Sequence, residues 1–208
     1  PARPFVAILG GAKVSDKIPI LKNLVEKVDG IAIGGAMAYT FLLAKGQKVG
    51  KSLVEPDMTE TCLSIMKRAE ERKIPFLLPI DHIIAKSIED TETECSNEVK
   101  EDFGGFDIGQ KTIENFKKEI SKAKTIVWNG PMGVFEKEQF KKGTVEIAKF
   151  VAELDAVKII GGGDSVSAVK VAGVEDKITH ISTGGGASLE LIAGEKLPGV
   201  EILYEKGE

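Results

Sequence analysis

The sequence has few cysteines, no long apolar segment and no excess of positive charge. Its only two cysteines, Cys62 and Cys95, form neither a C-x-x-C pair nor a dense framework. This excludes a disulfide-stabilised secreted scaffold and favours the reducing cytoplasm. The longest uncharged run, which includes residues 31–44, is too short to span a bilayer, and no signal-peptide pattern opens the chain. We therefore expect no membrane association.

The charge balance also argues against nucleic acid as a partner. The net charge is −4 and the pI is near 5.5, whereas a general nucleic-acid binder would be basic. His82 and His180 are the only histidines and lie in distant parts of the chain, so a metal site or catalytic triad built on them is not expected. The sequence is silent on oligomeric state, and a monomer is our expectation.

Glycine, by contrast, is abundant, with 23 residues among the 208. The length and the 42% hydrophobic content suit one large α/β domain. Strands alternate with helices, which predicts a six-stranded parallel sheet with helices on both faces, a three-layer α/β fold. The predicted strands are residues 5–9, 31–33, 74–80, 125–128, 157–160 and 178–181. The predicted helices are 13–27, one that follows the turn at 34–36 and ends near 46, 55–72, 112–123, 143–154, 166–171 and one after 183. Residues 90–101 are expected to form a loop or short edge strands.

Glycines follow five of the six predicted strands, and the carboxyl ends of parallel strands share one edge of the sheet. A glycine there lets a ligand approach the backbone closely. Tight turns would explain some of these glycines, but five clusters on one rim favour a ligand site. The clusters are residues 10–11, 34–35, 130 with 133, 161–163 and 184–186.

The segment 157–171 has the strongest chemical signal. A β-branched strand runs into Gly161–Gly163, after which Asp164 and Ser165 open an apolar helix. The amides and dipole of a helix N-terminus attract anions, phosphate above all. Asp164 has two interpretations, an N-cap or a Mg²⁺ ligand facing a nucleotide phosphate.

Two further strand ends carry candidate side chains. Lys13 and Lys17 are four residues apart, so they should lie on the same face in the first turns of the predicted helix. The helix dipole disfavours cations there, which suggests that an anion lies between the two lysines. The alternative is that one or both point to solvent. After strand 125–128, Asn129 offers a polar edge for a base or phosphate and Pro131 fixes the backbone. Glu136 is either a ribose acceptor or a first-turn acid that complements a helix dipole.

Several patterns carry no function. Trp128 is expected in the core, and Cys62 is expected to be buried and inert. Residues 46–52 resemble a phosphate-binding P-loop but are one residue short and follow a predicted helix, so we reject that match. The G-x-G-x-x-G fingerprint is missing, which weighs against a dinucleotide-binding oxidoreductase.

Taken in order, these segments resemble the carboxyl-terminal, nucleotide-binding half of the phosphoglycerate kinase family, which implies a Rossmann-like fold over residues 1–208. The resemblance departs at residues 103–106, where the family usually has a Trp-Met-Gly-Leu-like stretch, and at Ala36, where some members have glycine. The matching motifs are GGAKVSDK at 10–17, IGGAMAYTF at 33–41, WNGPMGVFE at 128–136, GGGDS at 161–165 and HISTGGGASLE at 180–190.

The resemblance also implies roles for individual residues. Nucleotide phosphates and Mg²⁺ would be held by Lys17, Gly162, Gly163, Asp164 and Ser165, with Asp164 as the metal ligand. Gly34 and Gly35 would form one wall of the adenine slot, and Gly105 and Phe106 would form another. Asn129 and Pro131 would border the nucleotide, and Glu136 would hold the ribose. The phosphoryl group in transit would meet Lys13, Lys17, Gly162 and Gly185, the last within 184–186.

The family reaction is reversible transfer of a phosphoryl group between 1,3-bisphosphoglycerate and ADP, giving 3-phosphoglycerate and ATP. The amino-terminal domain that binds phosphoglycerate is missing from this chain, which begins with Pro-Ala-Arg-Pro and is expected to be a piece of a longer polypeptide. We therefore expect it to bind MgADP or MgATP with little or no turnover. The alternatives are a non-catalytic, nucleotide-binding regulatory domain and, less favoured, the dinucleotide-binding oxidoreductase.

Overall fold

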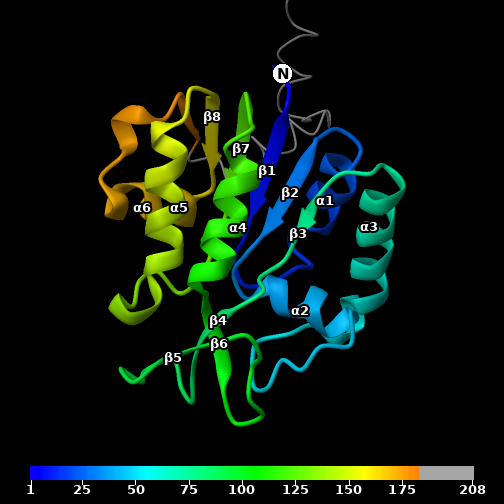
Figure 1. Ribbon diagram of the computed structural model, residues 1–208, viewed down its shortest axis with the longest axis vertical. Coiled ribbons are helices and arrows are strands. Elements are labelled where there is room, and N and C mark those ends of the chain that lie inside the picture. Colours follow the sequence, from blue (N-terminus) through cyan, green and yellow to red (C-terminus); the bar gives the residue numbers. More distant parts are fainter. Residues whose placement is uncertain (183–208) are drawn as a thin grey trace, which may run out of the picture.

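Six parallel strands form the central sheet of the computed structural model, in which residues 1–182 are described (Figure 1). Their order is β3-β2-β1-β7-β8-β9, so the chain winds outward in one direction from β1 and, after β7, in the other. The predicted six-stranded parallel sheet is confirmed, with its topological switch point between β1 and β7. The strands are β1 Phe5–Leu9, β2 Gly30–Ile33, β3 Phe76–Leu77, β7 Thr125–Asn129, β8 Val157–Gly161 and β9 His180–Ser182.

Helices cover both faces of this sheet. On β1, Phe5, Ala7 and Leu9 pack with the first three helices, whereas Val6 and Ile8 pack with the last three. A strand that is buried on both faces is apolar throughout, as this one is. The helices are α1 Ile18–Leu24, α2 Met37–Ala44 and α3 Thr59–Glu71 on one face, and α4 Gln110–Ile120, α5 Lys142–Glu153 and α6 Gly163–Ala172 on the other; short 3-10 helices are η1 Pro56–Met58, η2 Glu138–Phe140 and η3 Glu175–Lys177. None of the helices within residues 1–182 has the length and apolarity to cross a membrane.

Two of the predicted elements are much shorter in the structure. The strand predicted at 74–80 is reduced to Phe76–Leu77, which pairs with Ile31 and Ala32 only. Prolines at 75 and 79 explain this, because proline has no N–H to donate to a ladder. The helix predicted at 13–27 is only the seven residues of α1, and Pro19 lies in its first turn.

A second, three-stranded antiparallel sheet lies beyond the carboxyl ends of the large sheet's strands (Figure 1). It contains β4 His82–Ala85, β5 Glu94–Ser96 and β6 Gly104–Ile108, in the order β5-β4-β6. Of these, the sequence predicted only the possibility of short strands within 90–101. The small sheet matters for function because β6 forms one wall of the candidate site.

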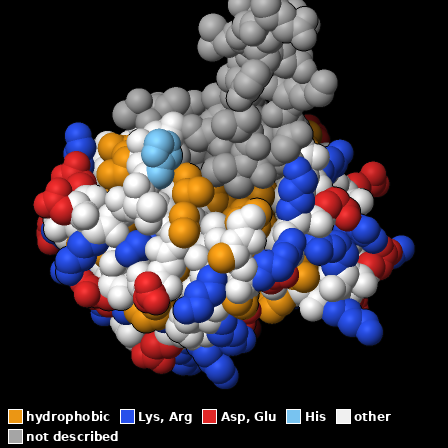
Figure 2. Space-filling model, turned by 90° about the horizontal axis from the view of Figure 1, so that it is seen from above, with side chains coloured by type: hydrophobic (Ala, Val, Ile, Leu, Met, Phe, Trp, Pro, Cys, Tyr) orange, Lys and Arg blue, Asp and Glu red, His pale blue; other side chains and the backbone are white. Residues whose placement is uncertain are grey.

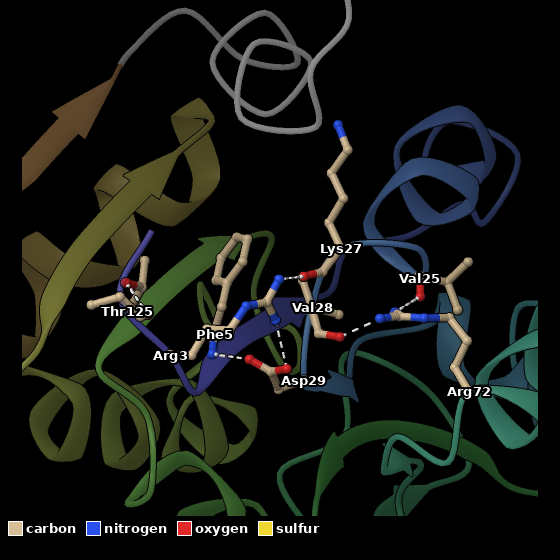
Figure 3. A network of polar contacts seen from close by, with 9 residues as sticks. Arg3, Phe5, Val25, Lys27, Val28, Asp29, Arg72 and Thr125 are labelled. Carbon is tan, nitrogen blue, oxygen red and sulfur yellow. Dashed lines mark hydrogen bonds and ion pairs between the residues drawn. The ribbon is translucent and has the colours of Figure 1, made fainter.

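A polar network ties the elements together at the opposite end, where the strands begin (Figure 3). Asp29, just before β2, accepts the backbone N–H of Phe5 at 2.7 Å and an Arg3 guanidinium hydrogen at 2.6 Å. Arg72, just after α3, donates to the carbonyl oxygens of Val25 and Val28 that follow α1. On the described surface seen from this end, acidic and basic side chains are interspersed (Figure 2).

Replacing Asp29 by alanine should lower the free energy of unfolding by about 1–3 kcal/mol, because the N–H of Phe5, a residue only 1% exposed, loses its partner. The measurement is urea denaturation followed by circular dichroism. Arg3→Ala is the matched control and should cost less than about 1 kcal/mol, because Arg3 and Asp29 form an exposed ion pair. Equal losses for the two variants would contradict this assignment.

Candidate functional site

The turns that follow β2, β1 and β7 pack backbone against backbone. A methyl group on Gly10 would lie within 3.0 Å of the Gly130 and Pro131 carbonyls, and one on Gly35 within 3.0 Å of Gly11. Hydrogen bonds join the same turns, from the Gly11 N–H to Pro131 O at 3.1 Å and from the Gly10 N–H to Asn129 O at 2.9 Å. Glycine is therefore required at 10, 35 and 130 by the packing of the rim itself. A structural role at some of these positions was expected, and these three glycines have one.

Two adjoining cavities open on this rim. One has a volume of about 290 Å³ and mostly apolar walls, and the other, called the polar cavity, has about 310 Å³ and mixed walls that carry two lysines. They share Gly11, Ala12 and Asp164, so they form one continuous groove at the switch point of the sheet. The apolar slot is lined by Gly35, Ala36, Leu53, Ile88, Gly105, Phe106, Pro131, Gly133, Val134 and Glu136; the polar cavity is lined by Gly10, Lys13, Asp16, Lys17, Asn129, Gly130, Gly162, Gly163 and Ser165.

The N-terminus of α6 opens into the polar cavity. Gly162 is its N-cap residue with φ 94°, a conformation that strongly favours glycine, so Asp164 is not the N-cap and one of its two interpretations is excluded. Outside its own helix, a methyl group on Gly163 would meet no atom of residues 1–182 within 4 Å. The first amides of a ten-residue helix lie here at the positive end of its dipole, an arrangement that favours anions, and Asp164 is exposed beside them.

Lys17 points into the same cavity and is half-buried. Burial lowers the pKa of its ammonium group, while Asp16 and Asp164 act in the opposite direction. Its Nζ donates to Asn129 Oδ1, and Asn129 Nδ2 donates to Gly161 O at 2.7 Å. Asn129 is thus held in one orientation between β7 and β8 and positions the lysine.

Lys13 lines this cavity too, although not for the predicted reason. The two lysines do not share a helix face, because α1 begins at Ile18 and Lys17 is its N-cap residue. Lys13 lies in the preceding turn and is exposed. The chain bends there, with the Lys17 N–H bonded to Val14 O at 2.9 Å, and this bend brings both cations to the cavity.

The apolar slot has two side chains that sequence analysis missed. Leu53 and Ile88 are 53% and 38% exposed, and they come from loops outside the large sheet. No periodicity marks them. Gly105 lies in the wall of the slot with Tyr39 on its other side, where the Tyr39 ring occupies the space that a side chain at 105 would need. Ser52 Oγ accepts a hydrogen bond from the Gly105 N–H at 2.9 Å and holds this backbone in place.

The phosphoglycerate kinase family model matches residues 1–195. The chain belongs to the phosphoglycerate kinase family. It is 59% identical over 214 residues to a phosphoglycerate kinase of Acidobacterium capsulatum and 53% identical over 209 residues to one of Finegoldia magna, and each match covers 99% of this chain. These alignments cover 52% and 53% of the relatives, so the chain spans about half their length.

Solved structures of family members agree with this fold. The phosphoglycerate kinase of Coxiella burnetii superposes with a TM-score of 0.93 at 41% identity, covering 98% of this chain and 53% of that one. That of Pyrococcus horikoshii OT3 gives 0.80 at 35% identity, covering 99% and 53%.

The structure brings together most of the residues that the resemblance to phosphoglycerate kinases singled out. Gly34 lies behind the slot, where Met132 fills the space a side chain would need. Ser165 is fully buried and accepts the Gly130 N–H at 2.6 Å. Gly185 lies outside the described residues. On the groove itself are Lys13, Lys17, Asn129, Gly162, Gly163, Asp164 and Ser165 in the polar cavity, and Gly35, Gly105, Phe106, Pro131 and Glu136 in the apolar slot.

The residues predicted to lack a site role have structural partners. Trp128 is fully buried and donates from Nε1 to Gly130 O at 2.7 Å. Cys62 is fully buried, and burial raises the pKa of its thiol to about 12, as expected of an inert thiol. His82 meets the Tyr39 hydroxyl through Nδ1 at 3.1 Å, and burial lowers its pKa to about 4. Glu136 is exposed at the slot and precedes η2, so it is not the first-turn acid of a helix.

Proposed function

We propose that residues 1–208 are the nucleotide-binding domain of a cytoplasmic phosphoglycerate kinase, the carboxyl-terminal half of a two-domain enzyme. The observation that carries this proposal is the continuous groove, in which a slot with apolar walls meets a cavity with two lysines and a helix N-terminus. An apolar slot next to a cationic cavity fits a nucleotide, which has a flat base at one end and anionic phosphates at the other. ADP and ATP are the ligands we assign to it.

The residues of the groove fit this assignment. The base would lie in the slot against Gly35, Gly105 and Phe106, with the Glu136 carboxylate near enough to accept ribose hydroxyls. The phosphates would lie at the α6 N-terminus beside Lys17. Since residues 1–182 contain no cluster of three or more metal-ligating side chains, Mg²⁺ would rely on Asp164 together with phosphate oxygens and water. When bound, the ion would neutralise phosphate charge.

The chemistry asked of this half is positioning and charge neutralisation. The carboxylate of 3-phosphoglycerate is already a nucleophile, so transfer of the phosphoryl group needs no general base. Lys13 and Lys17 would stabilise the charge that spreads over the transferring oxygens. The phosphoglycerate would be presented by an amino-terminal domain, and approach of the two halves would exclude water from the reacting groups.

The test is calorimetric titration of the folded chain with MgADP, followed by a coupled assay for ATP formation from 1,3-bisphosphoglycerate. We expect binding by the chain alone, no binding of NAD, and turnover only after the amino-terminal half of a relative is added. Failure of MgADP to bind a folded sample, or full turnover by the chain alone, would contradict the proposal. Binding without turnover in the presence of the second half would favour the regulatory-domain alternative.

A further inference from the structure

Asp107 is a buried carboxylate that the proposed chemistry does not use. It lies on β6 directly after Phe106 of the slot and is 2% exposed. Oδ2 accepts the Gly143 N–H at 2.8 Å, at the start of α5, and Oδ1 accepts the Ile108 N–H at 2.9 Å. A methyl group on Gly133 or Gly143 would lie within 3.0 Å of Oδ1, so the carboxylate fills space that two glycines leave open.

This carboxylate lies where two walls of the slot meet. Gly105 and Phe106 form the β6 wall, and Gly133 and Val134 form the wall that follows β7. The walls are joined by one backbone hydrogen bond, from the Val134 N–H to Phe106 O at 2.8 Å. Asp107 extends this seam by contacting the Gly133 turn and bonding to α5.

We propose that Asp107 is a positioning residue, which sets the width of the base slot by holding the β6 wall against the Gly133 turn and the start of α5. It does not touch the nucleotide. This inference rests on the proposed function, since it concerns how the same slot accepts a base.

If Asp107 positions the wall of the slot, ligand affinity should depend on whether its carboxyl group is ionised. A purely structural residue would not produce this dependence. Burial raises the pKa of its carboxyl to about 7, against the opposing effects of the two N–H donors and of Lys142 on α5. The Tyr39 phenol on α2 also faces it, with a pKa raised by burial and by Asp107, while Ile83 is its partner on β4. Above pH 7 the ionised carboxylate accepts both N–H groups strongly; below it, one oxygen carries a proton and holds its donor less well.

The probe is adenosine, which has no phosphate and does not titrate near neutral pH. For the unmodified chain we expect adenosine affinity to fall at least threefold between pH 8.5 and pH 5.5, with a midpoint near 7. Asp107→Asn should bind adenosine about tenfold more weakly at pH 8.5, since an amide nitrogen replaces one of the acceptors, and its pH profile should be flat.

Asp81→Asn is the matched control. Asp81 is also 2% exposed and bonds to the amides of Lys111 and Thr112 at the start of α4, but it does not line the slot. We expect it to lower the midpoint of thermal unfolding while leaving adenosine affinity and its pH profile unchanged. A parallel loss of adenosine affinity in both variants would overturn a specific role for Asp107.

The outcomes separate the two proposals. If neither adenosine nor MgADP binds the unmodified chain, the proposed function fails. If both bind but adenosine affinity is independent of pH and of Asp107→Asn, only the role of Asp107 fails. Should Asp107→Asn not fold, the pH profile of the unmodified chain still decides, because a flat profile contradicts the inference.

Discussion

Lys17→Ala is expected to reduce turnover by about a thousandfold when this chain is assayed together with a complementary amino-terminal half. Lys17 is the half-buried cation of the polar cavity and is held by Asn129 rather than by a carboxylate partner. In a site that the approach of the two halves shields from water, its charge would act strongly on the transferring phosphoryl group. A loss that falls mainly on kcat, with a smaller rise in the KM for MgADP, would indicate that Lys17 acts mainly in the transition state.

The change should not destabilise the fold. Burial lowers the pKa of Lys17, which means that the folded protein holds its charged form at a cost. The urea midpoint should therefore stay the same or rise. Lys22→Ala, an exposed lysine on the same helix α1, is the control and should keep full activity. Turnover of Lys17→Ala within tenfold of the unmodified chain would remove Lys17 from the chemistry.

Much of the fold was predictable because β1, β2, β7 and β8 are short, mostly apolar runs that end at or just before a glycine. The small sheet was not, and its sequence shows why. β6 reads Gly-Gly-Phe-Asp-Ile, which has two glycines and a buried acid where a strand pattern would have apolar residues. Tertiary contacts require those residues, since a side chain at Gly105 would overlap Tyr39 and Asp107 accepts a hydrogen bond from the start of α5. Such contacts cannot be inferred from periodicity.

The residues of the candidate site also fall into a group that could be predicted and a group that could not. Residues that follow strands, such as Asn129 and Asp164, were predictable because a parallel sheet gathers its strand ends at one edge. Leu53 and Ile88 were not, because their loops reach the slot by tertiary packing. The number of glycines does not show which of them face the groove, since sequence alone cannot separate a glycine that faces a ligand from one that faces another backbone.

Substitutions can distinguish a glycine that packs against another backbone from one that faces a ligand, and Gly130 is the example of the first kind. Gly130→Ala should lower the free energy of unfolding by about 3–5 kcal/mol, or prevent folding, because two penalties add. Its φ is 96°, a conformation that a residue with a Cβ rarely adopts, and the added methyl would overlap the backbone of Gly10. Urea denaturation of the purified variant measures the loss, and recovery only as insoluble protein would agree with it.

Gly163→Ala is the partner experiment, and the opposite result is expected. Outside its own helix, the added methyl meets no atom of the described residues within 4 Å, and it lies in the first turn of α6, so stability should change by less than about 0.5 kcal/mol. The methyl would instead occupy space beside the helix amides where the phosphates are proposed to bind, and MgADP affinity should fall at least tenfold, whereas adenosine affinity should not. Unchanged MgADP affinity would show that phosphates do not approach α6. A stable Gly130→Ala would show that the glycines of the rim are not needed for its packing, and that their number reflects the ligand after all.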